Sequence, residues 1–170
     1  MILPIVKEPH DILRHKADRV EKVTPEIRRL AADMIETMYA AEGVGLAANQ
    51  IGSPLHLFVA NPIDKRGEEL VLLNAVITNR SGEHQSPEGC LSLPGVSAPV
   101  TRAAEVTVTG MELNGGTVML KAKGFLAKIF QHEIDHLEGR LYPDRLPSAE
   151  GKRLFEKYRK LAETLRRVDL

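Results

Sequence analysis

The sequence predicts an α+β fold, with antiparallel β-sheets around a central helix and a further helix near each end of the chain. Three observations indicate this class. Apolar residues recur at helical spacing near both ends, over residues 27–39 and 154–165. Between them, short apolar stretches bounded by turn-forming residues are typical of antiparallel strands. A third helical stretch, around residue 132, lies between the last of these strands and the C-terminal helix.

The chain is expected to enter the fold as an extended segment over residues 1–23. The first helix is predicted to begin at Thr24-Pro25-Glu26, because Thr favours the N-cap, Pro fits the first helical position and an acid suits the first turn. It should end near residue 41. The small residues of 43–50 then form a loop whose backbone can approach a ligand or another segment closely. This loop lacks the G-x-G-x-x-G pattern and the P-loop lysine, so a phosphate cradle is not indicated.

Antiparallel strands are expected over residues 55–60, 69–78, 100–112 and 117–122. The last two are joined around Asn114-Gly115-Gly116, a strong hairpin signal. Residues 79–89 are polar and rich in turn formers, and we expect a loop there that leads into Cys90. Cys90 lies outside the apolar strand patterns.

Two helices are predicted to close the chain. One follows Gly124 and ends near Gly139, and the other spans residues 148–167. From Glu150 to Asp169 the chain carries seven basic residues against four acids. This excess fits either a solvated helix face or a docking helix for an anionic partner such as RNA.

Composition limits the class of protein. A chain of 170 residues, 43% apolar and 27% charged, suits one globular domain with a sizeable core. Its 23 basic and 23 acidic residues cancel, so the whole chain shows no bias toward nucleic acid or membrane. No apolar run approaches a membrane span, and no secretory signal peptide is indicated at the N-terminus. The single cysteine excludes an internal disulfide and fits a reducing compartment, so a cytoplasmic location is expected.

The pattern H-E-x-x-H at residues 132–136 indicates a metal site. Spacing of four residues places His132 and His136 on one face of a helix, where two imidazoles can bind one divalent metal. Glu133 would lie beside them and could move protons to and from a water at the metal. An ordinary surface helix with incidental histidines is the alternative that the motif alone leaves open.

The third metal ligand has three candidates. The metzincin pattern H-E-x-x-H-x-x-G-x-x-H is matched through Gly139, but Tyr142 stands where its last histidine should be. Glu156 could serve as the downstream glutamate of a thermolysin-like protease, although it lies on the basic C-terminal helix. Cys90 is favoured, because it is flanked by Gly89 and a thiolate binds first-row metals strongly.

Three stretches together resemble the signature motifs of the peptide deformylase family, in the same order and at similar separations: Gly43-Val44-Gly45-Leu46-Ala47-Ala48-Asn49-Gln50, Glu88-Gly89-Cys90-Leu91-Ser92 and Gln131-His132-Glu133-Ile134-Asp135-His136-Leu137. The resemblance covers essentially the whole chain. It implies a metal-dependent hydrolase that removes the N-formyl group from the N-terminal formyl-methionine of newly made polypeptides, with a metal-bound water as nucleophile. Residues 1–170 would then form a single catalytic domain, with the helix at 148–167 as an appendage.

The resemblance also implies a role for each site residue. Cys90, His132 and His136 would bind the metal, which in this family is usually Fe²⁺, with Zn²⁺, Ni²⁺ or Co²⁺ as substitutes. Glu133 would take a proton from the water and later deliver it to the leaving amine. Gln50 and the backbone N–H of Leu91 would bind the formyl oxygen as it gains charge.

The substrate-binding residues are inferred in the same way. The formyl group would lie between Gly45 and Gly89, and the methionine side chain would lie in an apolar pocket whose walls include Val44, Phe125 and Ile129. Leu91, the ring of His132 and the stem of Lys128 would complete that pocket. Ser97 departs from relatives that carry an arginine near the later residues of the substrate. By analogy, Glu42 and Arg102 are expected to form an ion pair.

The expected partners are nascent N-formyl-methionyl polypeptides, with no membrane. The C-terminal helix of this family can dock on the ribosome, and the basic helix at 148–167 is compatible with that role. Two other classes stay open from the sequence: a metalloprotease that uses Glu156 instead of Cys90, and an inactive relative that binds a partner through its basic helix.

Overall fold

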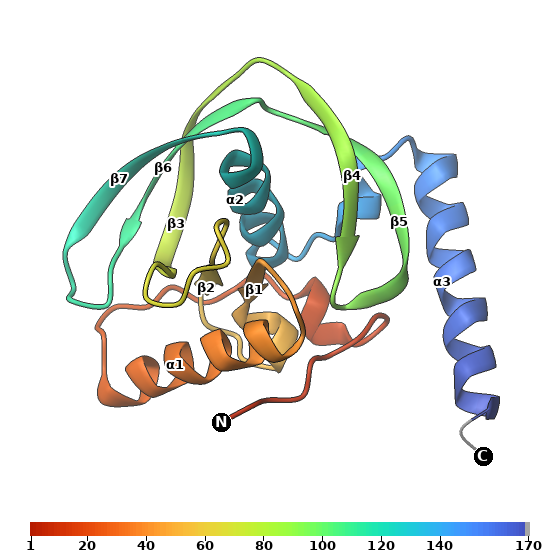
Figure 1. Ribbon diagram of the computed structural model, residues 1–170, viewed down its shortest axis with the longest axis horizontal. Coiled ribbons are helices and arrows are strands. Elements are labelled where there is room, and N and C mark those ends of the chain that lie inside the picture. Colours follow the sequence, from red (N-terminus) through yellow and green to blue (C-terminus); the bar gives the residue numbers. More distant parts are fainter. Residues whose placement is uncertain (169–170) are drawn as a thin grey trace.

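The computed structural model describes residues 1–168 (Figure 1). Its helices are η1 (Asp11–Arg14), α1 (Pro25–Ala40), η2 (Ala48–Ile51), α2 (Gly124–Leu137), η3 (Tyr142–Arg145) and α3 (Ser148–Val168), where η denotes a 3₁₀ helix. Its strands are β1 (Gly45–Ala47), β2 (Leu57–Ala60), β3 (Leu70–Ser81), β4 (His84–Cys90), β5 (Leu93–Arg102), β6 (Glu105–Met111) and β7 (Thr117–Lys123). No helix within the described residues is long and apolar enough to cross a membrane.

Two antiparallel sheets surround α2. Within residues 1–168, β1, β2, β3, β6 and β7 form one sheet in that order, and β4 pairs with β5 in the other. In Figure 1, α2 lies between the two sheets, α1 runs below them and α3 stands beside β5. The predicted α+β class, with antiparallel strands around a central helix, is confirmed.

Helix α1 begins where the sequence predicts. The hydroxyl of Thr24 accepts a hydrogen bond of 3.3 Å from the backbone N–H of Ile27, which caps the helix. Met34 and Met38 are fully buried on its inner face and belong to a core cluster that includes Leu57 of β2. This packing positions the end of α1, and therefore the segment of small residues that follows it.

Helix α2 is held by the larger sheet. Phe130 is fully buried, and its ring meets that of Phe58 edge to face, with centroids 5.8 Å apart. Ala127 and Leu137 belong to the same apolar cluster. Because this face of α2 is packed against the sheet, His132 and His136 are directed toward Cys90 and the smaller sheet.

The structure corrects three expectations about the strands. The loop expected over residues 43–50 is wrong in part, because it contains the short strand β1 and most of η2. The loop expected over residues 79–89 is wrong, because β3 runs to Ser81 and β4 begins at His84. These residues are polar because most of their side chains are exposed, not because they form a loop. The single strand expected over residues 100–112 is also wrong. The chain leaves one sheet after Arg102 and enters the other at Glu105, so the stretch contains the end of β5 and the whole of β6. The hairpin between β6 and β7 is confirmed.

Candidate metal centre and active site

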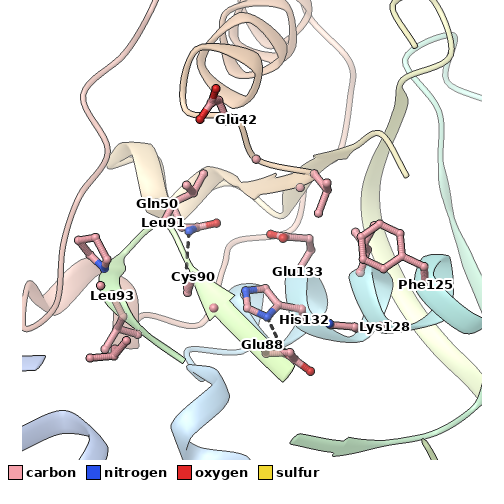
Figure 2. A pocket seen from close by; sticks show the side chains of 18 residues that line it. Glu42, Gln50, Glu88, Cys90, Leu91, Leu93, Phe125, Lys128, His132 and Glu133 are labelled. Carbon is pink, nitrogen blue, oxygen red and sulfur yellow. Dashed lines mark hydrogen bonds and ion pairs between the residues drawn. The ribbon is translucent and has the colours of Figure 1, made fainter. Parts of the chain in front are cut away.

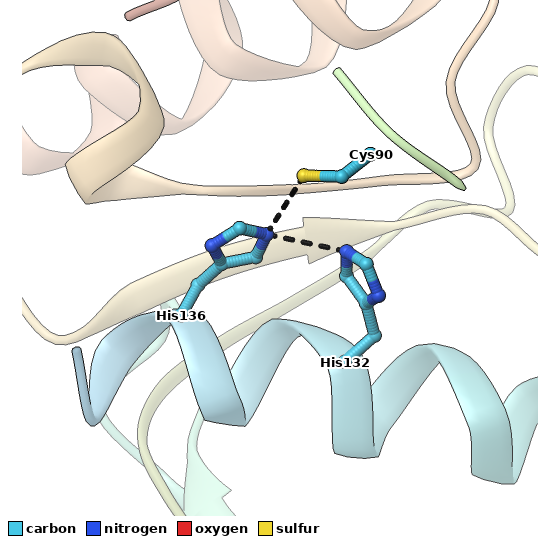
Figure 3. Close-up of side chains that lie close together, drawn as sticks. All are labelled: Cys90, His132 and His136. Carbon is cyan, nitrogen blue, oxygen red and sulfur yellow. Dashed lines mark hydrogen bonds between the residues drawn. The ribbon is translucent and has the colours of Figure 1, made fainter. Parts of the chain in front are cut away.

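Three side chains converge between the end of β4 and the face of α2 that is turned toward it (Figure 3). The sulfur of Cys90 lies 3.3 Å from Nε2 of His136, which lies 3.2 Å from Nε2 of His132. The three ligand atoms all lie within 4.8 Å of one another. One thiol sulfur and two imidazole nitrogens around a common point fit a first-row divalent metal.

A register shift in the smaller sheet aims Cys90 at this point. The pairing of β4 with β5 is irregular between Glu88 and Cys90, as in a β-bulge, and a bulge redirects the side chain that follows it. Cys90 is the last residue of β4, a strand whose polar sequence gives no apolar strand pattern. It is half-buried, and its sulfur accepts a hydrogen bond of 3.4 Å from the backbone N–H of Ser92.

A buried chain of charges fixes the orientation of His132. Nδ1 of His132 lies 2.8 Å from a carboxylate oxygen of Glu88, which leaves Nε2 to face His136. Arg102 donates to both oxygens of Glu88, at 2.6 and 2.9 Å, and to Asp135 at 2.8 Å. The expected ion pair of Glu42 with Arg102 is therefore wrong. Arg102 lies on the far side of Glu88 from the cavity, whereas Glu42 lines the cavity.

Replacing Arg102 with Met is expected to lower the free energy of unfolding by about 3–5 kcal/mol, because two buried carboxylates each lose a cationic partner. Glu88 would keep only His132, and Asp135 only Arg145. Urea denaturation monitored by circular dichroism measures the change. Arg167→Met is the matched control, because it removes an exposed ion pair and should change stability by less than about 0.5 kcal/mol. A loss below about 1 kcal/mol for Arg102→Met would contradict this account of the network.

The surroundings of the cluster favour positive charge. Burial acts to lower the pKa of His132, but Cys90 and Glu88 raise it to about 10. Burial and the neighbouring His132 lower the pKa of His136 well below its usual value. His132 therefore favours its positively charged form, while His136 favours its neutral form. The surroundings of the two imidazoles stabilise a cation.

Glu133 lies next to this cluster as a buried and unpaired carboxylate (Figure 2). Its Oε2 is buried without a hydrogen-bond partner among the described residues. Burial raises the pKa of Glu133 to about 7. A carboxyl group with a pKa near neutrality can both take up and release a proton under ordinary conditions, as a general acid–base requires.

Gly45 provides the space that Glu133 occupies. A Cβ atom at this position would lie 2.5 Å from Oε1 of Glu133. Gly45→Ala should therefore push the carboxylate aside, and we expect kcat to fall at least about tenfold, because misplacement of a catalytic group by about 1 Å can cost far more. Gly116→Ala is the control, because it lies outside the cavity in the β6–β7 turn and the atoms nearest to the added Cβ all belong to the side chain of Asn114. Equal kcat values for the Gly45→Ala variant and the wild type would contradict this role of Gly45.

Gln50 reaches the cluster from η2. Its Oε1 accepts a hydrogen bond of 2.9 Å from the backbone N–H of Ala47, which fixes the orientation of the amide. Its Nε2 then donates to the hydroxyl of Ser92 at 3.2 Å and lies 3.6 Å from the sulfur of Cys90. The Gln50 amide nitrogen is thus presented beside Leu91, which follows Cys90 directly.

A cavity of about 370 Å³ opens onto Glu133 and His132 (Figure 2). Every residue predicted to bind substrate lines it: Val44, Gly45, Gly89, Phe125 and Ile129. Leu91 and Lys128 also line it, and the ammonium group of Lys128 donates to the carbonyl of Pro87 instead of entering the cavity. One wall of the cavity was not predicted from the sequence. It is formed by Leu93, Pro94, Gly95 and Val96, and the only local sign of it is the short turn after Cys90.

The two rival third ligands do not join the cluster. Tyr142 is buried, its hydroxyl donates to the carbonyl of Val96, and its ring stacks beside that of His132 with centroids 6.3 Å apart. Glu156 is exposed on α3. Within residues 1–168, the group of side chains that could hold a metal is Cys90, His132 and His136.

Comparisons with known proteins show which family the chain resembles. A family model for polypeptide deformylase matches residues 2–152. A peptide deformylase of Aquifex aeolicus is 42% identical, over 96% of this chain and 99% of that one. A peptide deformylase of Symbiobacterium thermophilum is 49% identical over 85% of this chain, and the match covers 66% of that relative. The crystal structure of a peptide deformylase from Legionella pneumophila matches with a TM-score of 0.92 and 38% identity, over 98% of this chain and 99% of that one.

Proposed function

The chain belongs to the peptide deformylase family, whose members remove the N-formyl group from nascent polypeptides in a metal-dependent reaction, and we propose which of its residues carry that reaction. The observation that supports the proposal most strongly is the convergence of Cys90, His132 and His136 beside the buried carboxylate of Glu133. The substrate is the N-terminal formyl-methionine of a new polypeptide.

Cys90, His132 and His136 would hold the metal, and we propose Fe²⁺ as the physiological ion, with Zn²⁺, Ni²⁺ or Co²⁺ able to replace it. The thiolate and two imidazoles form a donor set suited to these ions. When bound, the metal supplies Lewis-acid chemistry and lowers the pKa of water at the site. The Glu88–Arg102 pair keeps His132 in the tautomer that presents Nε2.

The reaction is hydrolysis of a formamide. Water adds to the formyl carbon, the C–N bond breaks, and formate and a free amine leave. Glu133 takes a proton from the attacking water and delivers it to the leaving nitrogen, which a carboxyl group with a pKa of about 7 can do. The amide of Gln50 and the backbone N–H of Leu91 donate hydrogen bonds to the formyl oxygen as it gains negative charge.

The shape of the cavity supports selection for a formyl group on methionine. Gly45 and Gly89 line the cavity, and we propose that their backbone lies beside the formyl group and excludes the added methyl of an acetyl group. Steric exclusion is needed because one methyl in an apolar pocket changes binding by only about 1–3 kcal/mol. Val44, Phe125 and Ile129 would bind the methionine side chain.

Incubation with formyl-Met-Ala-Ser in the absence of oxygen, followed by mass spectrometry, tests this function. We expect loss of the formyl group alone, no reaction of acetyl-Met-Ala-Ser, and loss of activity on chelation with recovery on addition of Fe²⁺. Cleavage of an internal peptide bond would point instead to a metalloprotease. No reaction by the metal-loaded protein would point to an inactive relative.

We propose that α3 also binds the ribosome and that the protein acts in the cytoplasm, where new chains appear. The helix exposes basic side chains, among them Lys152, Arg153 and Lys157, which suit a phosphate-rich surface. Replacing these three by Ala should weaken co-sedimentation with ribosomes, and the wild-type interaction should weaken as salt rises. Absence of wild-type protein from the ribosome pellet at low salt would contradict the docking role.

A further inference from the structure

The N-terminal segment connects the two loops that carry Gln50 and Leu91. The backbone N–H of Val6 donates a hydrogen bond of 2.7 Å to the carbonyl of Gln50. Two residues later, the backbone N–H of Glu8 donates a hydrogen bond of 3.0 Å to the carbonyl of Ser92. Residues 6–8 therefore hold η2 on one side and the turn after Cys90 on the other, and we name them the N-terminal strap.

The strap is anchored to α3 through one ion pair. The side chain of Glu8 is only 5% exposed, so its carboxylate needs a partner to remain buried. Arg159 of α3 supplies that partner and contacts both carboxylate oxygens, at 2.5 and 3.3 Å. No other side chain within residues 1–168 donates a hydrogen bond to this carboxylate. In Figure 1 the red N-terminal chain passes near the lower ends of β4 and β5, on the side where α3 stands.

We propose that Glu8 and Arg159 are positioning residues that fix the spacing between the two hydrogen-bond donors for the formyl oxygen. This inference rests on the proposed roles of Gln50 and Leu91. Neither Glu8 nor Arg159 lines the cavity around Glu133, so neither is a catalytic residue. They act by anchoring the strap, which in turn holds the backbone of Gln50 and of Ser92.

The physical reason lies in how such donors work. Two hydrogen bonds to one developing oxyanion require donors that are already in place, because donors that must move during the reaction lose much of their effect. Gln50 and Leu91 are 41 positions apart in the sequence and lie in different loops, so their spacing depends on what joins those loops. The strap does so through two backbone hydrogen bonds. When Arg159 is lost, the buried Glu8 carboxylate favours moving toward water, and the strap moves with it.

Kinetics of Arg159→Gln with formyl-Met-Ala-Ser test the inference. We expect kcat to fall about tenfold with KM and metal content unchanged, since donors that act only in the transition state change kcat and not ground-state binding. Gln50→Ala removes one donor entirely and should lower kcat by about 100-fold to 1000-fold. This is the largest loss of kcat that a displaced donor could cause. The matched control is Arg167→Gln, which removes an exposed ion pair with Glu163 on the same helix and should retain the wild-type kcat.

Hydrogen exchange gives a readout that does not depend on turnover. The amides of Val6 and Glu8 should lose protection in Arg159→Gln and keep it in Arg167→Gln, because these amides form the strap's two hydrogen bonds. Arg159→Lys, which keeps the charge but loses the bidentate contact, should give intermediate values and serves as the test if the Gln variant does not fold.

Wild-type kcat in Arg159→Gln, or a loss that only matches a lower metal content, would overturn the inference. So would unchanged protection of the Val6 and Glu8 amides. An inactive wild-type protein is a different result, because it would contradict the proposed function itself, whereas a normal wild type with an unaffected Arg159→Gln variant contradicts only the role of the strap.

Discussion

Replacing Glu133 with Ala is expected to lower kcat for a formyl-Met peptide by about 100-fold to 10,000-fold, the usual contribution of a general acid–base. Glu133 is the carboxylate available for this task in the cavity wall. Glu88 also lines the cavity, but its two oxygens are held by Arg102 and His132, and Glu42 is more distant from the cluster in Figure 2. The substitution removes the proton carrier and leaves Cys90, His132 and His136 in place.

Steady-state kinetics and metal analysis of the same preparation measure this effect. The Glu133→Ala variant should bind one metal per chain and remain folded. Glu138→Ala, which removes an exposed glutamate just beyond α2, is the control and should retain the wild-type kcat. More than a tenth of wild-type kcat in Glu133→Ala would show that another group moves the proton.

Replacing Cys90 with Ser should lower deformylation to below about 1% of the wild-type rate. Loss of a residue that merely orients a metal ligand costs about 10-fold to 100-fold, and loss of the ligand itself should cost more. A serine hydroxyl is a hard, neutral oxygen and a poor substitute for a thiolate beside two imidazoles. We therefore expect less bound metal as well as lower activity.

The same substitution separates two classes of enzyme. A protease that used Glu156 as its third ligand would lose little activity on replacement of Cys90. Ser92→Ala serves as the control for local disturbance, because it removes the hydroxyl that accepts from Gln50 but keeps the backbone N–H that contacts the Cys90 sulfur. A Cys90→Ser variant that retained both full metal content and full activity would exclude Cys90 as a ligand.

The sequence predicted those elements that depend on interactions between residues close together in the chain, such as helix caps and tight turns. The start of α1 was predictable because Thr24 caps it, and the β6–β7 hairpin because Asn114, Gly115 and Gly116 favour a tight turn. Spacing alone was enough to place His132 and His136 on one face of α2. The chemistry of a thiolate favoured Cys90 as the third ligand, and the resemblance to a known family added Gln50, which spacing could not select.

The features that could not be predicted depend on contacts between distant segments. Residues 79–89 were expected as a loop, because strands of a small, solvent-exposed sheet carry polar side chains and lack the usual apolar pattern. The partner of Arg102 was assigned to Glu42, whereas the fold brings Glu88 and Asp135 to it. No local pattern indicates which of several acids a buried arginine will meet. The N-terminal strap could not be predicted either, because its hydrogen bonds to Gln50 and Ser92 are made by backbone atoms and leave no pattern in the sequence.

X-ray absorption spectroscopy of the zinc-loaded protein tests the ligand set, on which the whole account depends. We expect one sulfur and two imidazole nitrogens around each zinc ion, with the sulfur signal absent from Cys90→Ser. Zinc is a suitable probe because it undergoes no redox reaction and is among the ions that should occupy the site. A spectrum of the wild-type protein with only nitrogen and oxygen neighbours would show that Cys90 is not a ligand, and that Cys90, His132 and His136 do not together form the metal site.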